Sequence, residues 1–450
     1  MIVTEYANMP IKTNRIPFFF SILFVTFGTF GDVGQVSFGQ EGRSLKSKLG
    51  AAKANSNQTP EERAAEQKKK LEQQNELARN RLNSFGMLPA GDESEAAKKY
   101  RAAFEAFRLA AIDLNQVQVE FHLATQFTEE FRQKINNEWK DAIHKSFAAK
   151  TNWITVAAET FTSDPEKYLG IGATLSEMMI SDFELDRTDG WLNAAKAITL
   201  SRKFEREETL RAACLIAYAN ADFDFAEKCL EFQKEMGSSA KFLGELSTVR
   251  EKWQRELEIR KVEAEKNDNP RVEFLTTKGK LVIELYEDSA PEAVKSFMYL
   301  VERGFYKRKS FFRVEKHLCA QTGCEKGDGT GDAGYTIPGE ADLPGHRDHF
   351  RGTLAIALGS DEKTGKVLSD TGSSQFYISF LPAPNLDGKY AVFGRVIEGI
   401  ETMSFFRVMN LGEEAQRKEE KQPDYVLDCK VLRKRNTDYK PKIVAGKLPR

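Results

Sequence analysis

The chain has few of the residues that build metal centres or disulfide frameworks. It holds five cysteines and five histidines in 450 residues. An odd number of cysteines cannot pair completely within one chain, and neither a CxxC pair nor a His/Cys cluster at zinc spacing occurs. We therefore expect no structural metal and no cofactor. The cysteines are scattered along the chain: Cys214, Cys229, Cys319, Cys324 and Cys429.

An excess of charge of one sign is also missing. Lysine and arginine total 66 and aspartate and glutamate 67, so the formal net charge is −1. No global electrostatic field therefore favours nucleic acid as a partner. Hydrophobic residues make up 41% and charged residues 30%, which is typical of a soluble globular protein with charged helices. A chain of this length exceeds one ordinary core and predicts two or three domains.

Near the N-terminus, the apolar run IPFFFSILFVTFGTFG follows Lys12 and Arg15 and ends at Asp32. It is shorter than the roughly 20 residues of a transmembrane helix. A positive flank and a short apolar core are typical of a secretory signal, although an A-x-A cleavage signature is absent. We expect residues 1–40 to direct export to a periplasm, a secretory lumen or the outside of the cell. The alternative is an uncleaved anchor that tethers the chain to a membrane.

Residues 41–94 are polar and predict a tether with an exposed helix, which begins at a capping box formed by Thr59 and Glu62. Residues 95–265 predict an all-α region. Apolar residues recur there at helical intervals in AAKKYRAAFEAFRLAAIDL, namely Tyr100, Phe104, Phe107, Leu109 and Ala111.

Residues 213–235, ACLIAYANADFDFAEKCLEFQKE, predict two short helices around a turn at Asn220–Asp222, with Cys214 and Cys229 as small buried residues. This segment resembles a tetratricopeptide-type hairpin, a repeat family that often binds peptides or partner proteins. A 34-residue period is not visible, so an irregular helical domain is the alternative. The resemblance implies a surface for a protein partner on the helical region.

A long helix, GELSTVREKWQRELEIRKVEAEK, then leads to Pro270, where the helical pattern ends. We interpret it as the hinge between domains. Its predicted apolar stripe consists of Leu246, Val249, Trp253 and Leu257.

Beyond residue 270 the pattern changes to short strands. VEFLTTKGKLVIELY predicts two alternating strands around a Lys278–Gly279 turn. SAPEAVKSFMYLVERGF predicts a helix with Ser289 as its N-cap and Pro291 in its first turn. Its buried face comprises Val294, Phe297, Met298 and Val301.

Further strands are expected at SFFRV, TLAIAL, SQFYISF, AVFGRVI and YVLDCKVL, and a second helix at IETMSFFRVM. Many short strands with two helices predict a closed antiparallel β-barrel capped by two helices. Residues 436–450 form a basic C-terminal tail.

Five separated segments are informative together: SFFRV, GDGTGDAGYTIPGE, HFRGTLAIAL, GSSQFYISF and LDGKYAVFGRVIEG. Their order and spacing resemble those of a cyclophilin-type peptidyl-prolyl cis–trans isomerase. The resemblance covers residues 271–435. It implies binding of proline-containing peptides and of unfolded or partly folded proteins.

Rotation about an amide bond has a barrier of roughly 20 kcal/mol, yet no covalent bond breaks, so the reaction needs no nucleophile or metal. It needs an apolar pocket for the proline ring and a cation that favours the twisted amide. Arginine suits this task because it is always charged and carries several donors in a fixed fork.

The resemblance assigns catalysis to Arg313 and places Gln321 beside it, to bind the substrate backbone and to steady the arginine. It also assigns a set of substrate-binding residues. Leu318, Cys319, Tyr377, Leu386 and Tyr390 match the wall of the proline pocket; Ala357, Leu358 and Gly359 match the segment that offers backbone groups to a peptide; Gln375 matches a residue that flanks the groove.

Each assignment has an alternative. Arg313 could be a strand arginine that bridges to Glu315 or Glu340, and Tyr377 and Leu386 could be core residues. Cys319 could form a redox pair with Cys324.

The loop histidines and the departures from the family raise further questions. His346 and His349 could bind a metal, but we favour a solvated loop, and we assign His317 no partner. Lys316–His317 stands where many members have a Pro-Gly turn, and Asn385 where a tryptophan is often found. The loop that begins at Gly359 is longer than usual.

The sequence thus predicts an exported prolyl isomerase whose helical region holds clients or docks on a partner. Two alternatives remain open. The β domain could be a non-catalytic module that binds proline-containing peptides, or the helical region could be the main binding surface of a scaffold or chaperone.

Overall fold

A computed structural model describes residues 88–123, 129–236, 246–361, 363–409 and 423–448. The expected export signal, the capping box and most of the tether lie outside these ranges. The chain divides into two compact units, and the division falls between Trp153 and Ile154. Within the described ranges, no helix combines the length and the apolar character that a membrane span requires.

In the first unit, the first half of helix α4 (Glu95–Leu123) packs against the part of helix α5 (Glu129–Ser163) that carries Trp153. The ring of Trp153 lies 6.4 Å from that of Tyr100 and 5.2 Å from that of Phe107. Leu109 is 54% exposed, so its predicted place on the buried face is wrong. It stands two residues from both Phe107 and Ala111, which places it on the opposite side of the helix.

The second unit begins with four helices: α6 (Leu169–Phe183), α7 (Leu192–Leu200), α8 (Glu207–Ala219) and α9 (Phe223–Glu235). Helix α8 contacts the other three. The turn between α8 and α9 lies at residues 220–222, as predicted, and the Asp222 carboxylate accepts a hydrogen bond from the backbone of Phe225 at 3.1 Å. Cys214 and Cys229 are buried, also as predicted. The repeat character of this hairpin stays a prediction.

Helix α10 (Leu246–Lys266) follows. Its first two predicted apolar positions, Leu246 and Val249, are buried, but Leu257 is 40% exposed. The neighbouring carboxylate Glu256 is buried in its place. The predicted apolar stripe is therefore wrong at its last position, whereas Trp253 is half-buried and its ring centre lies 4.7 Å from that of Phe350.

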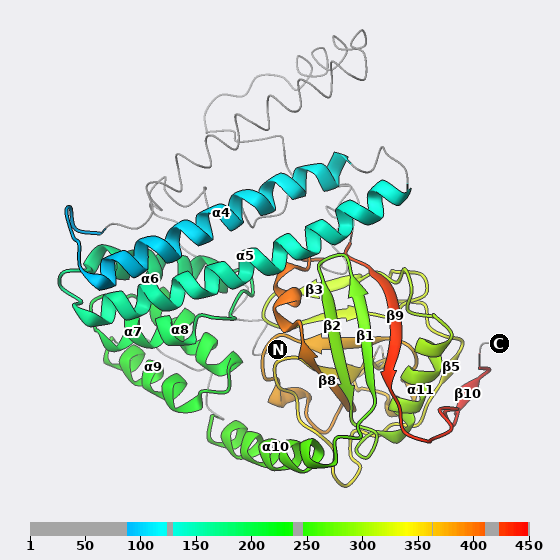
Figure 1. Ribbon diagram of the computed structural model, residues 1–450. Helices are drawn as coiled ribbons and strands as arrows, with labels where there is room; N and C mark the ends of the chain where they lie inside the picture. Colours follow the sequence, from blue (N-terminus) through cyan, green and yellow to red (C-terminus); the bar gives the residue numbers. More distant parts are fainter. Residues whose placement is uncertain (1–87, 124–128, 237–245, 362, 410–422, 449–450) are drawn as a thin grey trace, which may run out of the picture. The chain divides into compact units, whose positions relative to one another are not determined.

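An eight-stranded antiparallel sheet forms the rest of the unit (Figure 1). Its strand order is β3-β4-β7-β6-β8-β2-β1-β9. The bounds are β1 Arg271–Thr276, β2 Lys280–Leu285, β3 Arg313–Glu315, β4 Cys319–Thr322, β6 Thr353–Ile356, β7 Phe376–Ser379, β8 Val392–Glu398 and β9 Val426–Arg433. Strands β5 (Tyr335–Thr336) and β10 (Ala445–Gly446) form a separate pair, so part of the predicted tail is ordered against the sheet domain.

The hairpin of β1 and β2 around Lys278–Gly279 is confirmed. Strand β1 alternates as predicted, but β2 is buried at five consecutive positions and so lacks the expected alternation. Strand β3 begins at Arg313, so Phe311 and Phe312 are buried but precede the strand.

The sheet ends at β3 and β9, and isolated bridges pair Ser310 with Tyr425 and Val314 with Met409. Complete closure of the barrel stays a prediction. The second expected helix is a 3₁₀ segment, η7 (Ile400–Phe405), rather than an α-helix.

Helix α11 (Pro291–Glu302) buries its predicted face, with Val294, Phe297, Met298 and Val301 in the main core. Its N-cap differs from the prediction: the cap residue is Ala290, not Ser289. The carboxylate of Glu340 accepts from the backbone N–H groups of Glu292 and Ala293 at 2.8 and 2.9 Å. A side chain distant in sequence thus satisfies donors that a helix start leaves open.

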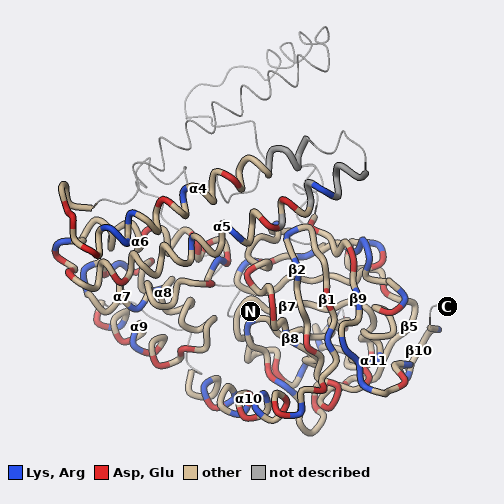
Figure 2. Tube along the Cα trace, viewed as in Figure 1, with Lys and Arg blue, Asp and Glu red and all other residues tan. Residues whose placement is uncertain are grey.

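Positively and negatively charged residues are both frequent along α10 (Figure 2). Several of them form ion pairs with opposite charges of the sheet domain. The Arg347 side chain is fully buried and donates two hydrogen bonds of 2.7 Å to Glu256 and one of 2.7 Å to Glu263. Its guanidinium lies 3.7 Å from the centre of the Tyr286 ring. A buried charge is tolerated when it is paired and hydrogen-bonded, and Arg347 is both.

Two buried carboxylates of the sheet domain meet cations of the same helix. Asp387 lies 2.5 Å from Lys252 Nζ, and Asp348 lies 2.5 Å from Arg255 Nη2. Burial and the nearby Asp387 raise the pKa of Asp348, whereas hydrogen bonds from His349 and Lys252 overcome burial and lower the pKa of Asp387. We call the pairs made by Lys252, Arg255, Glu256 and Glu263 of α10 the charge seam.

The charge seam predicts how stability depends on pH. Burial alone would raise the pKa of Glu256, but Arg347 and Arg260 outweigh it and lower this pKa below its ordinary value. A carboxylate with a lowered pKa stabilises the folded state fully above its unfolded pKa of about 4.3. That contribution is lost as the pH falls through the lower pKa of the folded state.

We expect Glu256→Gln to lower the free energy of unfolding by about 3–5 kcal/mol at pH 7, because it removes the carboxylate that accepts two of the three hydrogen bonds of a fully buried guanidinium. Denaturant unfolding of the full chain at several pH values measures this loss, which should shrink below pH 4. Glu258→Gln, on an exposed position of the same helix, is the control. Equal stabilities of the two variants at pH 7 would contradict the role of the charge seam.

Candidate active site

A row of directly opposed residues crosses five strands of the sheet. Arg313 of β3 pairs with Gln321 of β4, which pairs with Tyr377 of β7. Tyr377 also pairs with Ala355 of β6, and Ala355 pairs with Val392 of β8. Directly opposed residues in a sheet lie on the same face. The register therefore brings the two predicted catalytic residues and Tyr377 onto one side of the sheet.

The two faces of the sheet carry different apolar clusters. Phe376 and Ile378 belong to the main core with α11, while Tyr377 between them belongs to a second cluster. That alternation follows the period of a strand. The second cluster includes most of the predicted substrate-binding residues. Its members are Tyr286, Cys319, Ala355, Tyr377 and Val392, with Leu318, Ala357, Leu386 and Tyr390 packed against them.

Arg313 lies at the edge of this second cluster, with 29% of its side chain exposed. Its Nε donates to Glu315 at 2.7 Å and its Nη1 to Gln321 at 3.2 Å. Burial is the largest single effect and works against its charge, but the hydrogen bond to Glu315 and the charges of nearby groups together outweigh it, so the pKa of Arg313 is raised. Of the two bridges considered from the sequence, the one to Glu315 is present, whereas Glu340 caps α11.

Gln321 connects the arginine to a glycine-rich loop. Its amide donates to the side-chain oxygen of Gln375 at 3.0 Å, and Gln375 donates to the carbonyls of Gly329 and Gly331 at 2.9 and 2.8 Å. Gln375 therefore lies beside the two predicted catalytic residues. The chain of amides fixes the rotamer of Gln321, so its oxygen points at Arg313.

Tyr377 is held through its hydroxyl. Burial raises its pKa well above the usual value, so the group stays protonated. The hydroxyl lies 2.9 Å from His349 Nε2, and His349 Nδ1 lies 2.8 Å from Asp387. The Tyr390 ring stands nearly perpendicular to that of Tyr377, with centres 5.9 Å apart. Sequence reasoning missed His349: its side chain is fully buried and not part of a solvated loop.

His317 also has a partner, contrary to our interpretation of the sequence. Its backbone N–H donates to Asp186 at 2.8 Å, and its ring stacks on Phe183 with centres 4.3 Å apart. His317 has a φ of 59°, a conformation that favours glycine. The position at which the family resemblance implies a glycine is thus occupied by a histidine that Asp186 and Phe183 hold in place.

The expected peptide-binding segment 357–359 uses part of its backbone internally. The Ala357 N–H donates to the carbonyl of Gln375 at 3.0 Å. Gly359 donates to the Thr371 hydroxyl at 2.8 Å, and its carbonyl accepts from Leu368 at 2.9 Å. Backbone contacts of a peptide with this segment therefore stay a prediction, centred on Leu358.

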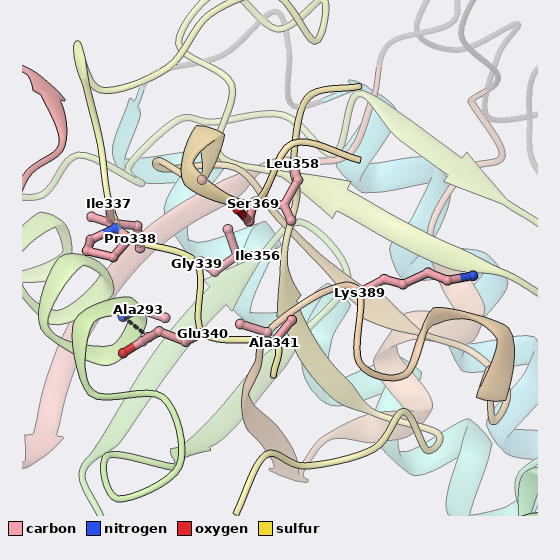
Figure 3. A pocket seen from close by; sticks show the side chains of 12 residues that line it. Ala293, Ile337, Pro338, Gly339, Glu340, Ala341, Ile356, Leu358, Ser369 and Lys389 are labelled. Carbon is pink, nitrogen blue, oxygen red and sulfur yellow. Dashed lines mark hydrogen bonds between the residues drawn. The ribbon is translucent and has the colours of Figure 1, made fainter. Parts of the chain in front are cut away.

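A small hollow beside this segment is distinct from the second cluster. Figure 3 shows it between the start of α11, the Ile337–Ala341 segment and the Leu358 side chain, with Lys389 extending away. Among the predicted site residues, it is lined by Leu358 alone. Glu340 closes one side and keeps its hydrogen bond to Ala293.

The cysteines are all free and buried, and Cys319 and Cys324 form no disulfide. Burial raises the pKa of Cys319 to about 12. Within the described ranges, no three His, Cys, Asp or Glu side chains are grouped as metal ligands would be.

Comparison with known proteins gives the class. Residues 271–431 match the family model "Cyclophilin type peptidyl-prolyl cis-trans isomerase/CLD". A peptidyl-prolyl cis-trans isomerase B of Bacillus subtilis is 42% identical over 129 residues, which are 28% of this chain and 84% of that protein. A peptidyl-prolyl cis-trans isomerase of Helicobacter pylori is 38% identical over 130 residues, 28% of this chain and 74% of that protein.

Among solved structures, a cyclophilin type peptidyl-prolyl cis-trans isomerase of Cryptosporidium parvum matches with a TM-score of 0.31 and 28% identity. The match covers 36% of this chain and 97% of that protein. The chain belongs to the cyclophilin-type peptidyl-prolyl cis–trans isomerases. It is an enzyme of that class, and the residues before 271 are additional to the part it shares with these relatives.

The buried thiols predict low reactivity. With a pKa of about 12, Cys319 carries almost no thiolate at pH 8, and the thiolate is the reactive form. We expect iodoacetamide to leave Cys319 unmodified in the native protein and to modify it fully in denaturant, as measured by peptide mass spectrometry. Rapid native labelling, or a Cys319–Cys324 disulfide under mild oxidation, would favour the redox alternative.

Proposed function

We propose that the chain isomerises X–Pro bonds on the face marked by Arg313, Gln321 and Tyr377, and that Arg313 assists the rotation of the amide. The observation that carries this proposal is the state of the Arg313 guanidinium. Glu315 and Gln321 hold it beside an apolar cluster, yet its Nη2 donors have no partner among the described residues. A charged, oriented and partly unsatisfied donor is suited to a ligand oxygen or nitrogen.

The chemistry follows from the electronic structure of the amide. As the C–N bond twists, resonance is lost, so the proline nitrogen becomes a better hydrogen-bond acceptor. A guanidinium that reaches this nitrogen stabilises the twisted state more than either planar form. Only such differential binding raises the rate of the step. The hydrogen bond from Arg313 Nε to Glu315 fixes the fork before the substrate arrives.

The second cluster supplies the apolar surface for the proline ring. Cys319, Tyr377, Leu386 and Tyr390 are the side chains that we assign to this contact. Gln321 binds a neighbouring peptide group and keeps Arg313 in place. Because these contacts address proline and the backbone, the site accepts many sequences, which suits unfolded or partly folded proteins as substrates.

The site of action is a further part of the proposal. The apolar run at residues 16–31, with its positive flank, supports export of the enzyme and therefore exported clients. The same run would serve as a membrane tether if it were not removed. The helical residues 95–265 would then hold clients or a partner protein near the isomerase site.

We expect Arg313→Ala to reduce kcat/KM by about 100-fold or more, as removal of one preorganised donor to a transition state does. NMR exchange between the cis and trans forms of a short Ala-Pro peptide measures the rate directly. Arg303→Ala, which removes an arginine at the end of α11, is the matched control and should retain full activity.

The same NMR experiment, with peptide binding measured alongside exchange, separates the alternative functions. If the normal protein binds the peptide without accelerating exchange, the face is a recognition module and the catalytic proposal is overturned. If the normal protein neither binds nor accelerates, the helical region is the remaining candidate for client binding. If Arg313→Ala accelerates exchange as well as the normal protein does, the catalytic role of Arg313 is refuted, but the isomerase activity of the chain is not.

A further inference from the structure

A continuous buried path leads from helix α10 to the wall of the candidate site. Lys252 Nζ lies 2.5 Å from Asp387 Oδ2, and Asp387 Oδ1 lies 2.8 Å from His349 Nδ1. His349 Nε2 then lies 2.9 Å from the Tyr377 hydroxyl. Asp387, His349 and Tyr377 are all nearly inaccessible to solvent, and 27% of the Lys252 side chain is exposed.

The acceptors and donors along this path agree with one another. Asp387 is ionised and can only accept, so His349 Nδ1 carries the proton that faces it. In the neutral ring, Nε2 then accepts from the Tyr377 hydroxyl. Asp387 Oδ1 also accepts from the backbone N–H of His349 at 2.8 Å, which fixes the orientation of the ring. Each member of the path therefore has a hydrogen-bond partner, and fully satisfied buried networks of this kind are rigid.

The path connects Lys252 to Tyr377, although the two residues are far apart in sequence. Without Lys252, the Asp387 carboxylate keeps its histidine but loses its cation, while the nearby Asp348 carboxylate loses Lys252 and keeps only Arg255. Two buried carboxylates without that lysine repel each other. Movement of Asp387 releases His349, and with it the hydroxyl that fixes Tyr377.

We propose that Lys252 and Asp387 are positioning residues: helix α10 fixes Tyr377 through Asp387 and His349, and so sets how tightly the site holds a proline-containing peptide. This inference rests on the proposed function, because Tyr377 must contact the substrate. It gives the helical segment a direct effect on the isomerase site. Neither residue touches the substrate.

The test uses the full chain and the Ala-Pro peptide. We expect Lys252→Met to raise KM by about 3–10-fold with kcat changed less than 2-fold, since one extra apolar contact contributes about 10-fold to specificity. Lys252→Arg restores the cation and should recover most of the affinity. Lys261→Met, an exposed position of the same helix, is the matched control and should behave as the normal protein.

A double mutant separates positioning from general destabilisation. Tyr377→Phe removes the hydroxyl at the end of the path, so Lys252→Met should have little further effect on KM in that background. Independent, multiplicative effects of the two changes would overturn the inference. So would a Lys252→Met variant that loses only thermal stability and keeps its KM.

The outcomes also separate this inference from the proposed function. An inactive normal protein would refute the proposed function. An active normal protein with Lys252→Met indistinguishable from Lys261→Met would refute the positioning role alone. The ¹⁵N chemical shifts of the His349 imidazole give an independent readout, and the His349→Gln variant identifies which signals belong to this ring. They should show a protonated Nδ1 and an accepting Nε2 in the normal protein, and the reverse tautomer would contradict the path.

Discussion

The pairing of buried charges between helix α10 and the sheet domain is the constraint on which the rest of the second unit depends. Arg347 is fully enclosed, and both of its carboxylate partners come from α10. Asp348 and Asp387 receive their cations from the same helix. A buried ion pair contributes little net energy compared with apolar packing, but breaking one is costly. The charge seam therefore acts mainly on specificity: a shift of α10 by one turn would leave charges of the sheet domain buried and unpaired.

That constraint extends to the site, because the residues that pair with α10 are adjacent in sequence to a residue that contacts the site. His349 follows Arg347 and Asp348 directly and supports Tyr377. On the other side of the row, the turn between β3 and β4 is held at His317 by Asp186 and Phe183. A histidine at positive φ costs of the order of 1 kcal/mol, and its contacts with the helical segment offset this cost. The helical segment thus contacts the site region from both ends.

These long-range contacts also show why sequence reasoning reached some features and not others. The buried face of α11 follows from local periodicity, and local periodicity predicted it. The partners of His317, Arg347 and Glu340 are 131, 91 and 48 residues away. No pattern within a helix or strand encodes such pairs, so His317 had no predicted partner and Ser289 was preferred as a cap. The roles assigned to Arg313 and Gln321 came from a family resemblance, which carries tertiary information that periodicity lacks.

A comparison of Arg347 with Arg313 shows how hydrogen-bond partners distinguish a structural arginine from one that is available to a ligand. All three guanidinium nitrogens of Arg347 donate to carboxylates, and its face is covered by Tyr286. Nothing of its charge remains to be compensated, so a ligand would have to displace an ion pair. Arg313 has one carboxylate partner on Nε and a neutral amide on Nη1, and its side chain is 29% exposed. Its charge is oriented but incompletely neutralised. The proposed recognition of a peptide nitrogen therefore belongs to Arg313, whereas Arg347 already has its full set of partners in the folded state.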